Sequence, residues 1–331
     1  MPTNPYSPLR WGILGAGSIA NRFSSDVKPL PDHQLAAVGS RDQSKADAFA
    51  DKFEIPRRYD SYEALVADPD VDVIYVATPH PFHKEHALLA IRAGKAVLLE
   101  KPFTINAAEA GIVVSEARRA GVFLMEGMWS RFFPALVKVR ELIAEKAIGD
   151  LRVLQADFGF RSGVNPEGRL FSPTLAGGAL MDVGVYTVSL ASMVFGTPER
   201  SVSLANLGST GVDEEAAMLL GYPGGGLAVL STAIRLNTPH EALFLGTDGN
   251  IKVHGAWWCP RKLTVKRAGK DEETLEFPYE GGGFQFEAQH VAECLRAGKT
   301  ESSVISLDET LSIMRTLDGL RAQFGLKYPM E

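Results

Sequence analysis

The chain has 331 residues, of which 34 are Lys or Arg and 40 are Asp or Glu, so its formal net charge is −6. Hydrophobic residues make up 45% and charged residues 22%, which is typical of a globular enzyme and excludes a disordered chain. The mildly acidic balance argues against nucleic-acid binding, which needs a basic surface. This length predicts about two domains, each large enough for its own core.

The sequence carries no clear membrane, export or metal signal. No stretch approaches the roughly 18 apolar residues of a membrane span. The segment Met1 to Pro8 contains three prolines and no apolar core, so we expect no secretory leader. Cys259 and Cys294 lack metal-site spacing and are expected to be reduced. We therefore expect a cytoplasmic protein with no membrane partner, no nucleic-acid partner and no metal.

The first part of the chain alternates short apolar strands with helices. Strands are expected at 9–14, 34–40, 71–77, 96–99 and 123–125, and helices up to about residue 25 and at 44–53, 61–67, 83–93 and 106–120. The helix near 83–93 stops at Gly94, a residue type that often ends helices. Such alternation with short connections predicts an α/β domain whose doubly wound parallel sheet is covered on both faces.

After about residue 133 the pattern changes and strands predominate. The expected strands are 151–160, 200–207, 214–222, 226–235, 242–246, 249–253, 261–267 and 273–277, and the helices are 134–147, 177–195, 284–297 and 307–324. This pattern predicts an α+β domain with a large, mostly antiparallel open sheet. We place the domains at residues 1–130 and 131–331, with the last helix able to pack back on the first domain.

The strand 227–236 is apolar on both of its alternating faces. Leu227, Val229 and Ala233 lie on one face, and Ala228, Leu230, Ile234 and Leu236 lie on the other. A sheet with one face in water would show one polar set of residues. Helices can cover one face, and either a second subunit or loops of this chain must cover the other. We favour a homodimer formed through this sheet.

A glycine-rich turn follows the first expected strand and opens a helix. The pattern is Gly15-x-Gly17-x-x-Ala20, and this context is the one that a dinucleotide-binding fingerprint requires. Gly15 allows the tight turn, Gly17 lets the backbone approach a pyrophosphate, and the helix begins near Ser18 and Ile19. The pyrophosphate would bind the first N–H groups and the positive end of the helix dipole. An ordinary glycine turn is the alternative, and its position in a strand–helix series favours the cofactor.

The end of the second strand distinguishes the two nicotinamide cofactors. An NAD site carries Asp or Glu there, whereas an NADP site places Arg near the 2′-phosphate. This chain has Ser40 followed by Arg41, a hydroxyl and a guanidinium that suit a dianionic phosphate. The alternative is that Asp42 serves NAD and Arg41 is an ordinary loop residue. We expect NADP rather than NAD.

Four motifs together resemble a known family. They are the Gly15–Ala20 turn, Ala77-Thr-Pro-His-Pro-Phe-His83, Glu100-Lys-Pro102 and Gly177-Gly-Ala-Leu-Met-Asp-Val-Gly-Val-Tyr186. In this order they resemble the glucose–fructose oxidoreductase / inositol dehydrogenase / rhizopine-catabolism (Gfo/Idh/MocA) family, which has a Rossmann first domain. The segment 125–134 is similar to its branch of dimeric dihydrodiol dehydrogenases and NADP-dependent xylose dehydrogenases. The resemblance implies that Thr78, Pro79, His80, His83, Glu100 and Lys101 contact the cofactor. His80 departs from the Asn of many members.

Oxidation of an alcohol needs a hydride acceptor and a group that removes the hydroxyl proton. Lys101 follows a parallel strand at the sheet edge where open α/β sheets bind ligands, and Pro102 comes directly after it. Tyr186 and Asp182 are four residues apart, so they would share one face of a helix. A free tyrosine has a pKa near 10, and a neighbouring ammonium group would lower it. We assign proton transfer to Tyr186 and expect Lys101 to lower the pKa of its phenol. Asp182 is expected to orient its partners. The alternative for Tyr186 is an aromatic residue packed within the helix.

Several aromatic and basic residues are candidates for substrate contact. Aromatic faces suit both the apolar side of a sugar ring and a planar diol. The candidates are Trp129, Phe160, Arg131 and Arg169, with core packing equally compatible for Trp129 and favoured for Phe158. At least one of Trp257 and Trp258 is expected near the cleft or a subunit interface. His33, His86, His240, His254 and His290 carry no motif and are interpreted as structural or solvated.

These observations predict an NADP-dependent oxidoreductase. It would transfer a hydride between the nicotinamide and a CH–OH group of a sugar, such as the aldose D-xylose, or of a cyclic trans-dihydrodiol. One alternative is a glycosidase of the same family that retains NAD, which would favour an acidic residue where Ser40 stands. Another is a non-enzymatic nucleotide sensor, which need not keep both Lys101 and Tyr186.

Overall fold

The computed structural model describes residues 7–331, so residues 1–6, most of the segment expected to carry no leader, lie outside the described residues. Contacts divide the chain into two compact units. The first unit holds the described residues up to Thr104, residues 108–129 and residues 280–310. The second unit holds residues 105–107, 130–279 and 311–331. A single boundary at 130/131 therefore does not describe the chain, because residues 280–310 return to the first unit.

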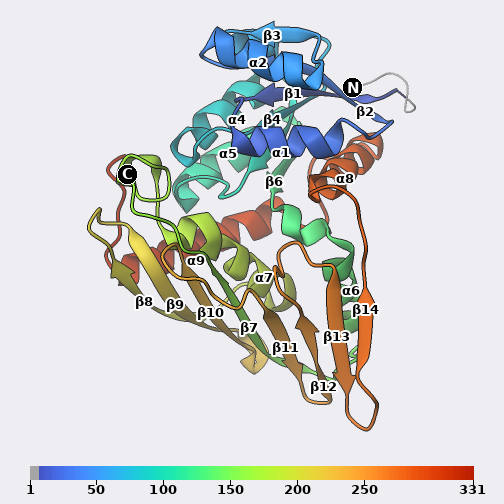
Figure 1. Ribbon diagram of the computed structural model, residues 1–331, viewed down its shortest axis with the longest axis vertical. Coiled ribbons are helices and arrows are strands. Elements are labelled where there is room, and N and C mark those ends of the chain that lie inside the picture. The colour runs from blue at the N-terminus through green and yellow to red at the C-terminus, as the bar shows by residue number, and fades with distance from the viewer. Residues whose placement is uncertain (1–6) are drawn as a thin grey trace. The chain divides into compact units, whose positions relative to one another are not determined.

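The first unit contains a six-stranded parallel sheet with the order β3-β2-β1-β4-β5-β6 (Figure 1). Its strands are β1 (Leu9–Leu14), β2 (His33–Gly39), β3 (Arg57–Tyr59), β4 (Val73–Val76), β5 (Ala96–Glu100) and β6 (Leu124–Gly127). Its helices are α1 (Ser18–Val27), α2 (Gln43–Phe53), α3 (Tyr62–Ala67), α4 (His83–Arg92), most of α5 (Ala107–Ala120), and α8 (Phe284–Arg296). This is the expected doubly wound sheet. Strand β3 is additional, because no strand was expected between residues 40 and 71.

The chain direction places the expected site residues along one edge of this sheet. The strand order reverses between β1 and β4, which is the point where open α/β sheets bind ligands. Gly15 follows β1, Ser40 follows β2, and Lys101 follows β5. Strands β4 and β5 are buried along their whole length, so their apolar side chains anchor the ends that carry these residues.

The second unit contains an eight-stranded sheet with the order β14-β13-β12-β11-β7-β10-β9-β8 (Figure 1). Its strands are β7 (Leu151–Gly159), β8 (Arg200–Leu207), β9 (Asp213–Gly221), β10 (Leu227–Ala233), β11 (Ala242–Gly246), β12 (Gly249–Val253), β13 (Lys262–Arg267) and β14 (Glu273–Glu276). All neighbouring pairs are antiparallel except β7 and β10, which are parallel. The expected α+β class with a mostly antiparallel sheet is confirmed.

Three helices accompany this sheet. They are α6 (Pro134–Ala144), α7 (Val185–Phe195) and α9 (Leu307–Gln323), whose residues from 311 onward belong to this unit. Helix α7 packs against β7 and β10. The hydroxyl of Ser203 on β8 donates to the backbone oxygen of Leu320 on α9 at 2.9 Å. Helices α7 and α9 therefore contact the sheet from β7 to β8.

The long helix expected at 177–195 is not one regular α-helix. Residues Leu180–Gly184 form a π-helical turn, and the α-helix begins at Val185. Asp182 lies in the π turn and Tyr186 in the first turn of α7, so the four-residue spacing of a regular α-helix does not describe their relation. The apolar pattern of this segment carries no signal that separates the two helix types.

One segment, Pro173–Phe195, is long and apolar enough by length and composition to cross a membrane, contrary to the expectation that no stretch approaches that length. However, 83% of its most apolar window is buried inside the protein. Helix α7 also packs on the sheet through β7 and β10. These contacts are those of a core helix, and its uniform apolarity follows from burial on all sides.

Candidate functional site

The turn after β1 has the geometry of a phosphate cradle. Gly15 has φ +100°, and a Cβ there would lie 3.2 Å from the Cγ2 atom of Thr78. Gly17 precedes α1, and a Cβ on it would meet nothing within 4 Å. Ser18 is exposed and Ile19 half-buried at the start of α1, whose N-cap Gly17 provides no side-chain hydrogen bond. The first N–H groups of α1 therefore face open space that a pyrophosphate can occupy.

The end of β2 separates the roles of Ser40, Arg41 and Asp42. The carboxylate of Asp42 caps α2, where it accepts hydrogen bonds from the Ser44 amide at 3.0 Å and the Ser44 hydroxyl at 2.6 Å. The Ser44 hydroxyl bond is the largest influence that lowers the pKa of Asp42. Because this carboxylate is engaged in the cap, the alternative in which Asp42 binds a ribose loses support. Ser40 is buried and Arg41 is exposed beside it.

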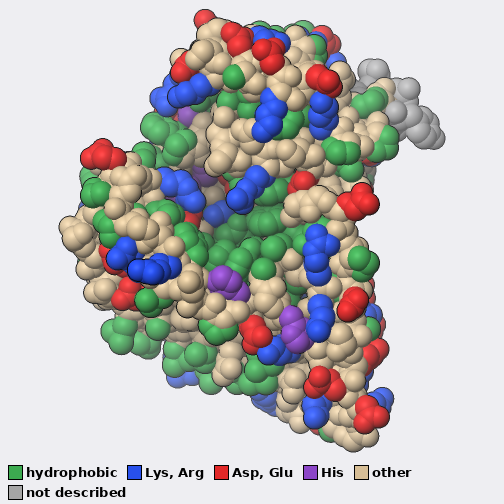
Figure 2. All heavy atoms as spheres, in the orientation of Figure 1, with side chains coloured by type: hydrophobic (Ala, Val, Ile, Leu, Met, Phe, Trp, Pro, Cys, Tyr) green, Lys and Arg blue, Asp and Glu red, His purple; other side chains and the backbone are tan. Residues whose placement is uncertain are grey.

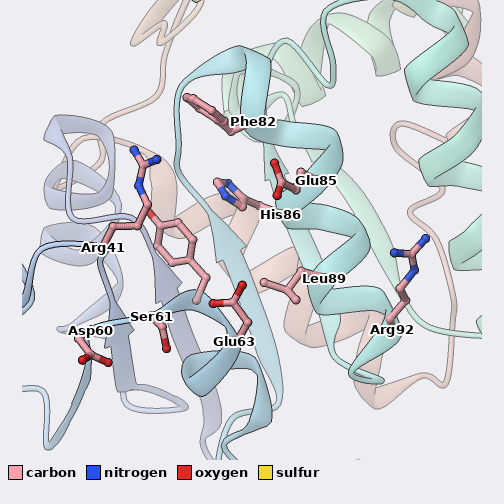
Figure 3. Close-up of a pocket in the computed structure, with 10 residues that line it drawn as sticks. Arg41, Asp60, Ser61, Glu63, Phe82, Glu85, His86, Leu89 and Arg92 are labelled. Atoms are coloured by element: carbon pink, nitrogen blue, oxygen red, sulfur yellow. The ribbon is translucent and has the colours of Figure 1, made fainter.

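A pocket of about 420 Å³ opens beside Arg41 (Figure 3). It is lined by Arg41, Asp60, Ser61, Tyr62, Glu63, Phe82, Glu85, His86, Leu89 and Arg92. These residues come from the loop after β2, the start of α3, and the segment of α4 with the 3₁₀ turn that precedes it. The Arg41 guanidinium carbon lies 5.4 Å from the centroid of the Phe82 ring. The pocket thus adjoins the position expected to bind the 2′-phosphate.

His83 lies beneath the expected cofactor loops rather than on their surface. Its ring is completely buried, with Nε2 2.8 Å from the backbone oxygen of Thr78 and Nδ1 2.8 Å from that of Pro102. Burial lowers the pKa of His83 to about 4. Both ring nitrogens already face carbonyl groups, which differs from the expected direct contact with the cofactor. Pro79 is exposed and His80 half-buried in the same loop.

Glu100 is the last residue of β5 and is buried. It accepts a short hydrogen bond from the phenol of Tyr75 on β4, and its Oε2 atom accepts a bond of 3.2 Å from the amide of Lys101. Lys101 itself is half-buried. Glu100 therefore supports the backbone that carries Lys101, and the neighbouring Glu287 of α8 is also fully buried.

Trp129 ends the segment 108–129 of the first unit and packs on α8 of the same unit. Its ring stacks on that of Phe284 with 4.5 Å between centroids and an interplanar angle of 2°. Phe284 in turn packs edge-on against Phe23 of α1. The ring of Trp129 is half-buried, so one face supports the fold while part of its surface stays open.

Tyr186 belongs to an aromatic cluster of the second unit. The Phe158 ring lies 5.4 Å from Tyr186 and stacks on Trp258 at 3.5 Å between centroids. His240 packs edge-on against Trp258 at 4.8 Å. The sequence analysis named Trp258 only together with Trp257 and interpreted His240 as structural or solvated, because no local motif connects either residue with Phe158. Tyr186 is 6% exposed at this cluster.

Asp182 is buried and pairs with Arg169 through a short ion pair, while the Arg169 side chain stays 58% exposed. The π turn that holds Asp182 is anchored by Asp213 of β9, whose Oδ2 atom accepts a hydrogen bond from the Leu180 amide at 2.6 Å. Burial raises the pKa of Asp213 to about 7. A Cβ on Gly178 would come within 2.1 Å of Asp213, so glycine is required there.

The structure places Arg131 differently from the expectation of substrate contact. Its side chain is 1% exposed, and it donates to the Ser189 hydroxyl at 3.0 Å and to the Ser189 backbone oxygen at 2.6 Å. The guanidinium is thus committed to helix α7. Phe160, by contrast, is half-buried directly after β7, where its amide donates to the backbone oxygen of Ala233 at 3.1 Å.

Lys101 and Trp129 therefore belong to the first unit, and Tyr186, Asp182, Arg169 and Phe160 to the second. Cys259 and Cys294 are free thiols. In residues 7–331, no group of three or more His, Cys, Asp or Glu side chains is arranged to hold a metal ion.

Two family models match the chain. The model of an oxidoreductase family with an NAD-binding Rossmann fold matches residues 9–128, and that of the GFO/IDH/MocA C-terminal domain matches residues 136–252. The chain is 43% identical to the trans-1,2-dihydrobenzene-1,2-diol dehydrogenase of Mus musculus, covering 98% of this chain and 99% of the relative. It is 41% identical to the Homo sapiens enzyme of the same name, with the same coverage.

Solved structures show the same architecture. A 3-ketoreductase from Actinomadura kijaniata in complex with NADP and TDP-benzene superposes with a TM-score of 0.86 at 25% identity, covering 96% of this chain and 98% of that one. An aldose–aldose oxidoreductase from Caulobacter crescentus complexed with glycerol superposes with a TM-score of 0.85 at 26% identity, covering 96% of this chain and 97% of the other.

Proposed function

Because the chain belongs to the Gfo/Idh/MocA oxidoreductase family, we propose that it is an NADP-dependent dehydrogenase acting on a CH–OH group of a sugar or a cyclic trans-dihydrodiol. The family and the relatives make it a nicotinamide-dependent oxidoreductase. The preference for NADP and the identity of the substrate are our inferences.

One observation carries the cofactor preference. Asp42 is the acidic residue that would have to bind the ribose hydroxyls of NAD, but its carboxylate caps α2. Arg41 remains exposed, and no ion pair involves it within residues 7–331. A dianionic 2′-phosphate would supply an anionic partner for this guanidinium, which lies over the ring of Phe82. The glycine turn at Gly15 and Gly17 leaves the room that the pyrophosphate needs.

The chemistry is assigned to Lys101 and Tyr186. When bound, the nicotinamide supplies the acceptor for the hydride. Tyr186 accepts the proton of the substrate hydroxyl, and Lys101 stabilises the charge that develops on oxygen as this proton leaves. Asp182 and Arg169 form an ion pair, and this pair keeps the Asp182 carboxylate oriented. Asp182 thereby orients the substrate rather than acting as a base.

The substrate preference rests on the aromatic cluster and the relatives. Stacked Phe158 and Trp258 offer flat apolar surface, and this suits a planar diol ring or the apolar face of a sugar. The relatives named for trans-1,2-dihydrobenzene-1,2-diol favour the diol. The structural similarity to an aldose–aldose oxidoreductase supports a sugar as the second candidate substrate class.

The same proposal includes a cytoplasmic homodimer. On β10, Leu227 and Val229 are 39% and 45% exposed, and Ala228 and Leu230 are buried. Val229 pairs with Leu219, and Leu219 pairs with Val202, which are 46% and 60% exposed, so an apolar row crosses three strands. Hydrophobic side chains gather along the border over β8 to β10 in Figure 2. A second copy of this sheet would cover the row by two-fold packing.

The deciding experiment follows reduced cofactor at 340 nm. The chain is supplied with NADP⁺ or NAD⁺ and with a panel of trans-dihydrodiols and aldoses. We expect turnover with NADP⁺ on members of one of these classes. Turnover that prefers NAD⁺, or no turnover on any diol or sugar, would overturn the proposal.

A further inference from the structure

His240 lies beside the aromatic cluster of the second unit. Its ring centroid is 4.8 Å from that of Trp258 and 5.8 Å from that of Phe158, with interplanar angles of 72° and 70°. The Trp258 and Phe158 rings stack only 3.5 Å apart, so a ring on the outer face of Trp258 would be much farther from Phe158 than His240 is. The imidazole therefore stands nearly upright at the edge of the stacked pair.

The backbone fixes His240 in this place. The residue has φ +63°, in the left-handed region that is uncommon for residues other than glycine. Its amide donates to the Asp157 carboxylate at 2.7 Å, and the Glu241 amide donates to the same carboxylate at 3.4 Å. Asp157 directly precedes Phe158 on β7. The loop that holds His240 is thus tied to the strand that carries the cluster.

The two nitrogens of the His240 ring have different surroundings. Nε2 makes a short hydrogen bond with the backbone oxygen of Gly159. A carbonyl oxygen only accepts, so Nε2 carries the proton of the neutral ring and Nδ1 holds a lone pair. Nδ1 has no hydrogen-bond partner within residues 7–331 and is not sealed from solvent. The cluster therefore presents one fixed hydrogen-bond acceptor beside apolar rings.

We propose that His240 Nδ1 accepts a hydrogen bond from a second, non-reacting hydroxyl of the substrate. The inference rests on the proposed function, to which it adds a specificity-determining residue. The substrate ring would lie on Trp258, which is half-buried, whereas Phe158 behind it is buried. Tyr186, to which the reacting hydroxyl is assigned, lies 5.4 Å from Phe158 between centroids. The two hydroxyls would then be bound at two points of one cluster.

An uncharged acceptor is selective for a hydroxyl group. A hydroxyl can donate a hydrogen bond, whereas an ether oxygen, a carbonyl or a carboxylate offers only lone pairs to Nδ1. A site built to bind a substrate hydroxyl also discriminates against the analogue that lacks it, because the polar group of the protein then stays unpaired. His240 would therefore favour a diol or a sugar over a mono-alcohol of the same shape.

Two substitutions separate this contact from a packing role. In His240→Asn the side-chain oxygen takes the position of Nδ1, and Asn is well suited to a left-handed backbone. In His240→Gln the amide nitrogen reaches the Gly159 oxygen in place of Nε2, but no acceptor remains at the Nδ1 position. His254→Gln is the matched control, because His254 lies 2.7 Å from the Thr264 hydroxyl through Nε2 and is no part of the cluster.

The measurement is kcat/KM with NADP⁺ for substrates that differ by one hydroxyl. The sets are trans-cyclohexane-1,2-diol with cyclohexanol, and D-xylose with its 2-, 3- and 4-deoxy analogues. We expect His240→Gln to lower kcat/KM for the parent diol or sugar about three- to tenfold, because one neutral hydrogen bond is lost. Its kcat/KM for cyclohexanol, or for one of the deoxy analogues, should stay unchanged. His240→Asn and His254→Gln should keep the wild-type preference for the parent.

Thermal unfolding checks the folding of each variant. If His240→Gln does not fold, His240→Gly, which suits the same φ and removes both nitrogens, should show the same selective loss. Equal losses on the parent and all analogues, equal losses in the Gln and Asn variants, or no loss at all would overturn the inference and make His240 a packing residue. A wild type that turns over no diol or sugar would contradict the proposed function itself, and this inference with it.

Discussion

His83 joins the loop after β4 to the loop after β5: its Nε2 lies 2.8 Å from the Thr78 carbonyl oxygen and its Nδ1 lies 2.8 Å from that of Pro102. The neutral ring carries one N–H group, so it donates to one of these carbonyls at a time. Pro102 directly follows Lys101. The ring therefore links the backbone next to the lysine to the loop after β4.

Replacing His83 with Leu should lower both stability and cofactor affinity. The one N–H group that serves these two buried carbonyls is lost, which costs about 1–3 kcal/mol. Urea unfolding and NADP titration measure the two effects. His33→Leu is the matched control, because His33 is also buried in the first unit and accepts from the indole of Trp11 at 2.9 Å. His33→Leu should reduce stability alone. Equal losses of cofactor affinity in both variants would contradict a positioning role for His83.

Arg41→Ala should weaken NADP far more than NAD. Loss of a charged hydrogen bond costs about 1.5–3 kcal/mol, or roughly 10- to 150-fold in affinity. Fluorescence titration with each cofactor gives the ratio. Arg92→Ala serves as the control. Arg92 also lines the pocket, but it is the last residue of α4 and does not follow β2. A similar loss for both cofactors in Arg41→Ala would show that this residue does not bind the 2′-phosphate.

Glu287→Gln should change how stability depends on pH. Burial raises the pKa of Glu287 well above its ordinary value, and the charge of Glu100 adds to the effect. Neither carboxyl oxygen has a hydrogen-bond partner within residues 7–331. The folded state therefore holds a proton that the unfolded state releases above about pH 4.3.

Stability should consequently fall as pH rises from about 4.3 toward the folded pKa of Glu287, by up to about 1.4 kcal/mol per pH unit. Glutamine has no proton to lose, so the variant should gain stability over the wild type as pH rises. Urea midpoints between pH 5 and pH 9 measure this difference. Parallel curves for the two proteins would mean that Glu287 is not protonated in the fold.

Val229→Lys should dissociate the proposed dimer. The substitution puts a charge in the middle of the apolar row on β8 to β10, where a covering sheet would have to bury it. Sedimentation velocity at micromolar concentration should then show a monomer. Ile112→Lys is the control, because Ile112 is 52% exposed on α5 of the first unit and is no part of this row. A wild type that sediments as a monomer would refute the assembly directly.

The edge of the first sheet could be predicted because parallel strands bring their carboxyl ends together. The turn at Gly15 and the residues Ser40 and Lys101 each follow an apolar run, and this local pattern was enough to place them. Long-range packing was not accessible in the same way. The stack of Trp129 on Phe284 joins residues 155 positions apart, and no local pattern in either segment indicates this contact.

Buried polar residues were the hardest to interpret. Arg131 was expected to contact substrate, and only the fold reveals that it is buried and donates two hydrogen bonds to Ser189. His83 was likewise expected to contact the cofactor. A sequence motif gives the residue type but not the direction in which its ring points. The π turn at Asp182 begins with Leu180, whose amide donates to Asp213, and no periodicity in the sequence indicates a contact between segments so far apart.

The measurement that tests the account most directly is the single-turnover rate of hydride transfer to NADP⁺ in Tyr186→Phe, with Lys101→Met and the double variant alongside. Tyr186→Phe should lower this rate by about 10²–10⁴-fold while NADP affinity stays within twofold, since general acid–base groups contribute about this much. Lys101→Met should cost as much or more, and the double variant should lose less than the product of the single losses. A near-normal rate in Tyr186→Phe at saturating cofactor, with hydride transfer rate-limiting, would make Tyr186 a packing residue and contradict the mechanism.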